Sequence, residues 1–438
     1  MNPDGTESYW SRPRIAFWAA AAAVVAAGYG SQFVGVFRPP SGAYLDYVQE
    51  WLSAQNFWAG QPVYRPQADA ILDHTGRAID MTALPWNGHP PGAVLAALPF
   101  GLFADYRDAH LAWNLATFPL FVLAVWIVLR ELRAPVRAWS LLPAVALTLV
   151  CFPVLVQLGQ GQLNFLLAPL LALGWAADRR GWPVRAGVYL GLAAGLKLFP
   201  AFIFVYLLFA GRWRALAVGV VVLIAVNLAA WMAFGTDAFV TYVRDVLPSL
   251  QVFRGSWRNV SATGFWTRAL GPTAPGLAQG LAAASVLAVT VAVGWRAWSA
   301  RTVEDRDRAF AAANLGMLLA SPVAWTHYFV LLAVPLGLLW MRLSAGWTRA
   351  VFLPTAAVLW LPENVFAVLA LGRDRAAEIV NLHDLPVGPG ANLLGLSAFT
   401  YSLAALFGLL AFAPLAPGQE APLNPPAPVP IIPTDQPS

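Results

Sequence analysis

The stretch YLDYVQEWLSAQNFW, residues 44–58, lies in the longest polar interruption of an otherwise apolar chain. The interruption extends over residues 35–107 and also contains GHPPG, residues 88–92. Within 44–58, apolar residues such as Val48 and Leu52 recur at helical spacing, which predicts a helix with one apolar face. A helix of this kind can lie on a membrane surface, so the segments on either side of the interruption decide how it is held.

The composition of the chain is that of a membrane protein. Of 438 residues, 59% are hydrophobic and 11% are charged, and the mean hydropathy is +0.61. Soluble domains contain about 25% charged residues. The net charge of +5 comes from arginine, which indicates membrane topology rather than binding to nucleic acid. The single cysteine, Cys151, excludes a disulfide within one chain and a cysteine-based metal site.

The first apolar segment, residues 15–34, is long enough to span a bilayer. Arg12 and Arg14 precede it, which places residues 1–14 in the cytoplasm and the 35–107 loop outside. No cleavage site follows the segment, so we expect it to be retained.

A second apolar stretch within the loop, residues 91–103, is too short to span the membrane. We therefore expect juxtamembrane helices at both 45–58 and 91–103. If residues 91–103 crossed the membrane, the arginines at positions 130, 133 and 137 would fall outside, against the positive-inside rule.

The remaining apolar runs predict an all-α polytopic protein with about twelve transmembrane helices and both termini in the cytoplasm. The later spans are expected near residues 108–130, 139–157, 163–178, 184–199, 200–212, 215–234, 276–297, 308–325, 327–343, 350–371 and 392–413. A transmembrane domain would thus occupy residues 15–413, with further outer loops at 235–275 and 372–391. The Pro-rich tail, 414–438, is expected to be disordered.

Asp46 is the first candidate for catalysis. A carboxylate at the bilayer surface is partly desolvated, which raises its basicity and suits a general base. An N-cap or a solvated loop carboxylate is the alternative. Glu50 follows one helical turn later and could share the same face, although a helix-surface charge is the simpler interpretation.

Four cationic side chains are candidates for binding a phosphate. Lys197, the only lysine, stands at the outer end of a span, where a charge is costly unless it is functional. Its alternative is snorkelling to the interface. Arg254 and Arg258 flank Trp257, and arginine with an aromatic ring suits a phosphate and a sugar face; a solvated loop is the alternative. His327, at the outer end of another span, either binds a phosphate oxygen, orients Asp46 or makes a structural hydrogen bond.

Neutral and acidic side chains complete the set. Gln160, Gln162 and Asn164 lie at an outer turn and could bind hydroxyl groups. Glu363 is a candidate intramembrane carboxylate. The glycosylation sequon at 259–261 is a short match with little weight. The sequence contains no Walker A motif, no dinucleotide-binding loop and no metal-ligand spacing, which argues against an ATP-driven pump or a redox enzyme.

Several short motifs occur in a fixed order along the chain. They are DY at 46–47 with GQPVY at 60–64, HPP at 89–91, GQGQLN at 159–164, GLKLFP at 195–200 and SPVAWTHY at 321–328. In order and spacing they resemble family 87 glycosyltransferases, the polyprenol-phosphate-mannose-dependent mannosyltransferases with a GT-C fold. The resemblance covers about residues 44–328.

This resemblance implies a GT-C fold with two juxtamembrane helices in the first outer loop. It implies that Asp46 is the catalytic base, and it matches His327 and Lys197 to a family histidine near the donor phosphate and to a family lysine. His89 departs from the family, where tyrosine is common before the Pro-Pro pair, and Tyr328 stands where a second histidine is frequent.

We assign the candidate residues to two further roles. Donor phosphate binding is assigned to Lys197, His327, Arg258 and Arg254. Sugar or acceptor binding is assigned to Tyr44, Tyr47, His89, Gln160, Gln162, Asn164, Trp257 and Trp325. No metal and no cofactor are expected, because the cations of the chain itself can stabilise a leaving phosphate.

The expected activity is transfer of a hexose, implied by the resemblance to be mannose, from a polyprenyl-phosphate sugar. The acceptor is a hydroxyl group of a glycolipid or polysaccharide on the outer side of a bacterial inner (plasma) membrane, and the anomeric configuration is inverted. One rival function is a transporter or flippase of lipid-linked sugars, which predicts two similar halves and a charged site at mid-membrane; neither is visible in the sequence. Another rival is a non-catalytic assembly factor for envelope polysaccharide.

Overall fold

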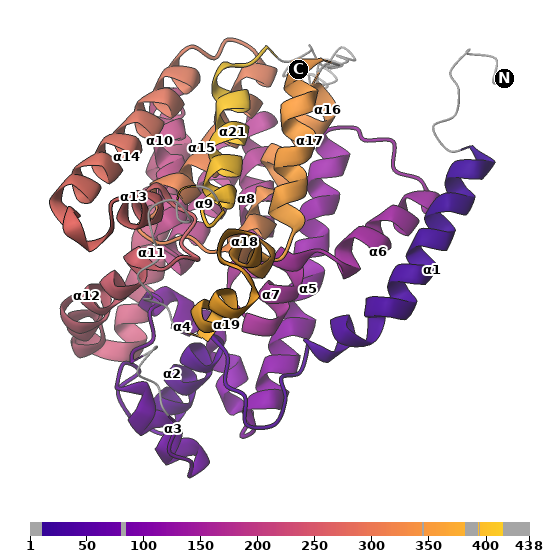
Figure 1. Cartoon of the computed structure of the whole chain (residues 1–438). Coiled ribbons are helices and arrows are strands. Elements are labelled where there is room, and N and C mark those ends of the chain that lie inside the picture. Colours follow the sequence, from indigo (N-terminus) through magenta and orange to yellow (C-terminus); the bar gives the residue numbers. More distant parts are fainter. Residues whose placement is uncertain (1–10, 80–84, 344–345, 382–392, 394, 415–438) are drawn as a thin grey trace, which may run out of the picture.

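The computed structural model describes residues 11–79, 85–343, 346–381, 393 and 395–414, and within these ranges the chain is helical with no strand (Figure 1). The predicted all-α class is confirmed. The predicted disordered tail and most of the predicted cytoplasmic N-terminus lie outside the described residues, as does part of the third outer loop. In that loop the structure describes α19 (Arg373–Asn381).

Among the described residues, several helices are long and apolar enough to cross a membrane. They are α1 (Arg12–Gly35), α5 (Tyr106–Glu131), α14 (Pro275–Trp298) and the helix that starts as α11 (Trp213–Thr241). Two further spans are bent pairs: α6 (Leu141–Leu149) with α7 (Phe152–Gln160) at 64°, and α17 (Trp347–Trp360) with α18 (Glu363–Leu371) at 97°. Four to six such spans are therefore present, and the count of about twelve stays a prediction.

Shorter helices form the centre of the bundle (Figure 1). They are α8 (Asn164–Arg179), α9 (Pro183–Leu196), α10 (Ile203–Phe209), α15 (Val303–Ala320), α16 (Ala333–Arg342) and α21 (Ala398–Phe412). Helix α15 is buried along most of its length, because small residues such as the alanines at 309 and 311–313 let neighbouring helices approach closely. Arg308 donates hydrogen bonds to the main-chain carbonyls of Leu410 and Ala413, which ties α15 to the end of α21.

Glycines bring the helices that hold the site into main-chain contact. A Cβ atom at Gly191 of α9 would lie 2.5 Å from the carbonyl oxygen of Gly219 on α11. A Cβ atom at Gly92, in α4 (Pro91–Ala97), would lie 2.3 Å from the carbonyl oxygen of Gly195. Only glycine allows such approaches. The second contact fixes the loop that contains Gly92 against the end of α9, two residues before Lys197. This loop, residues 35–107, is called the first outer loop after its predicted side of the membrane.

The first outer loop contains both predicted helices, at α2 (Val48–Trp58) and at α4, which continues as a 3₁₀ turn (Leu98–Leu102). A third helix, α3 (Gln67–Thr75), was not expected. Helix α2 does not present a polar face to water, as a surface helix would. Its polar residues Gln49, Glu50, Ser53 and Asn56 are buried, because residues of α3 and of the segment before α4 cover them.

The second predicted outer loop, residues 235–275, is largely helical rather than open. Gly235, with φ of 77°, kinks α11 without ending it. The chain continues through a π-helical turn (Tyr242–Val246), α12 (Leu247–Ser249) and a 3₁₀ turn to Gly255, and then forms α13 (Ala262–Leu270). The sequon asparagine, Asn259, is fully buried and bonded to the main chain, so this structure does not present it for glycosylation.

Candidate active site

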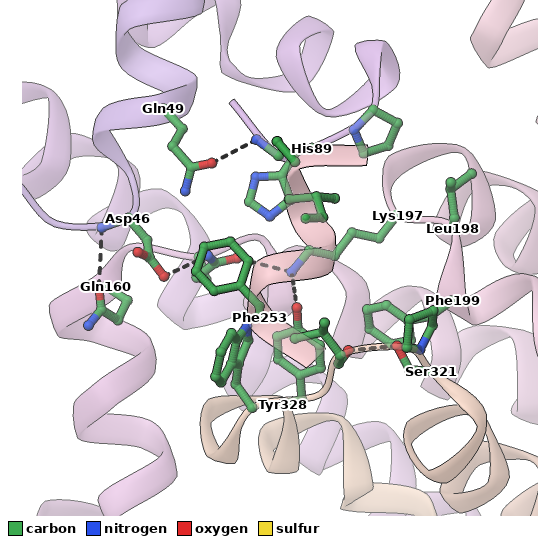
Figure 2. A pocket seen from close by; sticks show the side chains of 18 of the residues that line it. Asp46, Gln49, His89, Gln160, Lys197, Leu198, Phe199, Phe253, Ser321 and Tyr328 are labelled. Atoms are coloured by element: carbon green, nitrogen blue, oxygen red, sulfur yellow. Dashed lines mark hydrogen bonds between the residues drawn. The ribbon is translucent and has the colours of Figure 1, made fainter. Parts of the chain in front are cut away.

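A cavity of about 1020 Å³ lies between the first outer loop and the helix ends of the bundle (Figure 2). Its wall is mostly apolar, with a few convergent polar groups, as is usual for a small-molecule site. The predicted site residues that line it are Tyr44, Asp46, His89, Gln160, Gln162, Lys197, Arg254, Arg258, Trp325 and His327. Residues far apart in the sequence are thus brought together at one place.

Asp46 lies in the turn that precedes α2, and its position is fixed by the end of α7. Its main-chain N–H donates to Gln160 Oε1 at 3.2 Å, and its carboxylate accepts a hydrogen bond from Gln162 Nε2 at 3.0 Å. Burial raises the pKa of the Asp46 carboxyl above its ordinary value, and the bond from Gln162 opposes this. Asp46 is therefore a stronger base than an ordinary aspartate, as a general base requires.

The turn at Gly161 allows both neighbouring glutamines to reach Asp46. Gly161 has φ of 63°, and a Cβ atom there would lie 2.7 Å from Cβ of Tyr47. The main-chain N–H of Tyr47 also donates to the carbonyl of Gln160 at 2.8 Å. The close contact between this turn and the start of α2 therefore requires glycine.

Lys197 lies at the other end of Gln162. Its Nζ donates to Gln162 Oε1 at 3.0 Å, lies 3.4 Å from the hydroxyl of Tyr328 and 4.4 Å from the centre of that ring. The residue is only 4% exposed, and in the part of the chain that the structure describes it forms no ion pair with a carboxylate. A buried ammonium with neutral partners alone is costly, so an anion that entered the cavity would be held strongly.

Arg258 occupies the cation-rich side of the cavity together with Glu363. Its Nε lies 2.9 Å from Glu363 Oε1, and Thr326 donates to the second carboxylate oxygen at 3.1 Å. The 97° bend before α18 brings Glu363 to the cavity wall. The candidate intramembrane carboxylate Glu363 is thus the ion-pair partner of Arg258, a candidate for binding the donor phosphate. The sequence did not reveal this pairing.

His327 is 5% exposed and lines the cavity, and its Nε2 has no hydrogen-bond partner among the described residues. A buried nitrogen without a partner is unfavourable unless a ligand supplies one. This placement is what a phosphate ligand requires, whereas a purely structural histidine would have its bonds satisfied by the protein.

Glu50 forms a pair with His89. Glu50 is 2% exposed, and its Oε1 is hydrogen-bonded to Nδ1 of His89. The simpler interpretation of Glu50 as a helix-surface charge is therefore wrong, because the segment before α4 covers this face of α2. The spacing of Glu50 four residues after Asp46 was the only sequence signal.

Three predicted sugar-binding or acceptor-binding residues do not line the cavity. Tyr47 is fully buried and stacks on Trp113 with ring centres 5.2 Å apart. Asn164 is also fully buried and donates to Gln157 at 2.8 Å, behind Lys197. Trp257 packs against the guanidinium of Arg258, whose Cζ atom lies 5.2 Å from the centre of the Trp257 ring. These three residues therefore pack around the groups that line the cavity and do not line it themselves.

The titratable groups of the cavity come from two parts of the chain. Asp46 and His89 come from the first outer loop, whereas Lys197, Arg254, Arg258, His327 and Glu363 come from the bundle. A carboxylate in the same cavity as several cationic groups suits a reaction in which one group loses a proton and another gains negative charge.

Comparison with known proteins gives matches of three kinds: to a family model, to similar proteins and to a solved structure. The family model of glycosyltransferase family 87 matches residues 87–325. A polyprenol-phosphate-mannose-dependent alpha-(1-2)-phosphatidylinositol pentamannoside mannosyltransferase of Mycobacterium tuberculosis is 32% identical over 62% of this chain and 63% of its own length. The match therefore spans less than two thirds of that relative.

A polyprenol-phosphate-mannose-dependent alpha-(1-2)-phosphatidylinositol mannoside mannosyltransferase of Mycolicibacterium smegmatis is 28% identical over 69% of this chain and 72% of its own. Among solved structures, ArnT from Cupriavidus metallidurans in the apo state matches 91% of this chain and 77% of its own, at 18% identity and a TM-score of 0.38.

Proposed function

Since the chain belongs to glycosyltransferase family 87, we propose that it transfers mannose from a polyprenyl-phosphate sugar to a hydroxyl group of a glycolipid. The observation that supports this most directly is the chain of contacts from Asp46 through Gln162 to Lys197. It provides a base and a phosphate-binding cation within one cavity. The named relatives use polyprenol-phosphate-mannose and act on phosphatidylinositol mannosides, which supports mannose as the sugar and favours a glycolipid over a polysaccharide as acceptor.

In the proposed reaction, Asp46 takes the proton of the acceptor hydroxyl as its oxygen attacks the anomeric carbon. The bond between that carbon and the phosphate oxygen breaks, and its electron pair goes to the polyprenyl phosphate. Attack from the side opposite the leaving group inverts the configuration. A single carboxylate is enough, because the phosphate needs no strong acid to leave, in contrast to the carboxylate pairs of most glycosidases.

Lys197, Arg258 and His327 would stabilise the negative charge that grows on the leaving phosphate. Arg254, which also lines the cavity, adds to the positive potential. No metal or cofactor takes part in this proposal. Transfer should therefore continue when the protein is assayed in an excess of a chelator.

The proposed setting is a bacterial plasma membrane, with both termini in the cytoplasm and the cavity open to the outer leaflet. The basic residues Arg12 and Arg14 at the start of α1 support this orientation. A flippase of lipid-linked sugars is the alternative, and the match to a glycosyltransferase family favours transfer over lipid movement.

The test is sugar transfer by the purified protein in nanodiscs, with radiolabelled polyprenyl-phosphate-mannose and a membrane glycolipid pool. Wild type would be compared with Asp46→Asn and with the control Asp69→Asn, an exposed carboxylate of the same loop outside the cavity. Transfer should be lost in the first variant, with donor binding kept, and unchanged in the second.

Transfer that survives Asp46→Asn would remove Asp46 from the role of base. If no labelled product forms with wild type although the donor binds, a flip assay in liposomes separates the two functions. Rapid movement of the donor between leaflets would then support the flippase.

A further inference from the structure

The Glu50–His89 pair has no part in the reaction as proposed. The Glu50 carboxylate is almost completely buried, and a buried charge is costly unless it is paired and hydrogen-bonded. His89 lines the cavity, and in the described part of the chain its Nε2 has no hydrogen-bond partner. Because Glu50 engages Nδ1, the ring presents Nε2 to any ligand.

The segment that bears His89 is held rigidly against α2. Asn87 Nδ2 donates to the carbonyl of Gln49 at 3.1 Å and to Ser53 Oγ at 2.9 Å. The main-chain N–H of His89 donates to Asn87 Oδ1 at 3.0 Å, and the hydroxyl of Tyr64 donates to the carbonyl of His89 at 2.6 Å. The main chain of His89 and the Nδ1 atom of its ring are therefore both held in place. Such a ring is preorganised, which is typical of a binding group.

His89 lies near both partners of the proposed reaction. The contact of Gly92 with Gly195 brings the segment before α4 to the end of α9, where Lys197 follows. Asp46, His89 and Lys197 line the same cavity, and Figure 2 shows all three among the side chains that line it. His89 is also close enough to Asp46 for its charge to lower the pKa of that carboxyl.

The position of the ring identifies its ligand. With the phosphate at Lys197 and the attacking oxygen at Asp46, the group between them is the sugar that moves. We propose that His89 binds a hydroxyl group of the transferred sugar through Nε2 and that Glu50 is the positioning residue that orients the ring. This inference rests on the proposed function, because it takes the donor to be a lipid-phosphate sugar.

The experiment measures binding rather than turnover. Dissociation constants would be determined in nanodiscs for polyprenyl-phosphate-mannose and for polyprenyl phosphate, which lacks the sugar. The ratio of the two constants isolates the contribution of the sugar. Wild type, His89→Gln, Glu50→Gln and the control His74→Gln would be compared; His74 bonds Asn56 at 2.8 Å outside the cavity.

Wild type should bind the sugar-bearing lipid more tightly than the sugarless one. In His89→Gln that preference should fall by about 10- to 100-fold, as expected for a lost hydrogen bond in a buried site, with binding of polyprenyl phosphate retained. Glu50→Gln, which keeps the shape of the pair, should lose part of the preference, and His74→Gln none of it. Glu50→Gln also serves as the test if His89→Gln fails to fold.

The inference would be overturned if His89→Gln kept the same preference for the sugar-bearing lipid as wild type. If His89→Gln does not fold, an unchanged preference in a folded Glu50→Gln would overturn it instead. So would the absence of any preference in wild type. Failure of the proposed function looks different, since wild type would then transfer no sugar in the labelled assay whatever the binding ratio.

Discussion

Replacing Lys197 by methionine should weaken donor binding without weakening the fold. Lys197 is 4% exposed, and among the described residues its ammonium has only neutral hydrogen-bond partners: Gln162 Oε1 at 3.0 Å, the Tyr328 hydroxyl at 3.4 Å and Asn164 Oδ1 at 3.5 Å. Burying one such charge costs several kcal/mol, whereas each hydrogen bond to a charged group returns about 1.5–3 kcal/mol. The two effects nearly cancel, and methionine fills a similar volume without a charge.

The effect on binding should be much larger. Removing one member of a buried, hydrogen-bonded charge pair costs about 2–5 kcal/mol, which raises the Kd for the lipid-phosphate donor by roughly 30-fold to several thousand-fold. The donor Kd and the thermal melting temperature would be measured on the same nanodisc preparation. Arg38→Met is the control, because Arg38 forms a half-exposed ion pair with Asp108 outside the cavity.

Two results would refute this reasoning. A donor Kd within about threefold of wild type would show that Lys197 does not hold the phosphate, since a difference of that size is below 1 kcal/mol. A melting temperature lowered by more than about 5 °C would show that the ammonium stabilises the fold through its neutral partners.

Further predictions concern the base and the loop contact. At saturating donor, kcat should fall as the pH is lowered, because a protonated Asp46 cannot take the proton of the acceptor hydroxyl. Since the pKa of Asp46 is raised, the midpoint of this fall should lie at a higher pH than for an ordinary aspartate. Gln162→Leu should lower kcat by about 10- to 100-fold and move that midpoint to still higher pH, because the lost hydrogen bond had lowered the pKa. Gly92→Ala should lower both the melting temperature and donor affinity, since its Cβ would collide with Gly195, whereas Gly159→Ala, which meets open space, should change neither.

Much of the site could be inferred from the sequence, because charges in an apolar chain are few. Asp46 and Lys197 each stand at the edge of an apolar segment, where a charge needs a reason. Asp46 and Lys197 are far apart in the sequence, and nothing in the sequence indicates that the side chain of Gln162 contacts both. The helices at 45–58 and 91–103 followed from length and periodicity alone.

The features that escaped prediction depend on tertiary contacts. Hydropathy does not show that a span bends by 97°, so the pairing of Glu363 with Arg258 could not be foreseen. Periodicity identifies the faces of a helix but not what covers them, so it predicts Glu50 as a helix-surface charge, whereas the structure buries it. The motif at 46–47 does not show that Asp46 and Tyr47 point in different directions, and the ring of Tyr47 packs on Trp113 rather than lining the cavity.

The bridging amide of Gln162 has a consequence for the electric field in the cavity. A neutral side chain keeps Asp46 and Lys197 apart, so the two opposite charges do not collapse into a contact pair that would cancel both. They remain as the poles of a fixed dipole. In the proposed reaction, negative charge moves from the Asp46 side, where the proton is accepted, to the phosphate at the Lys197 side. That displacement runs along the field, and a field that is already oriented needs no reorganisation as the sugar moves.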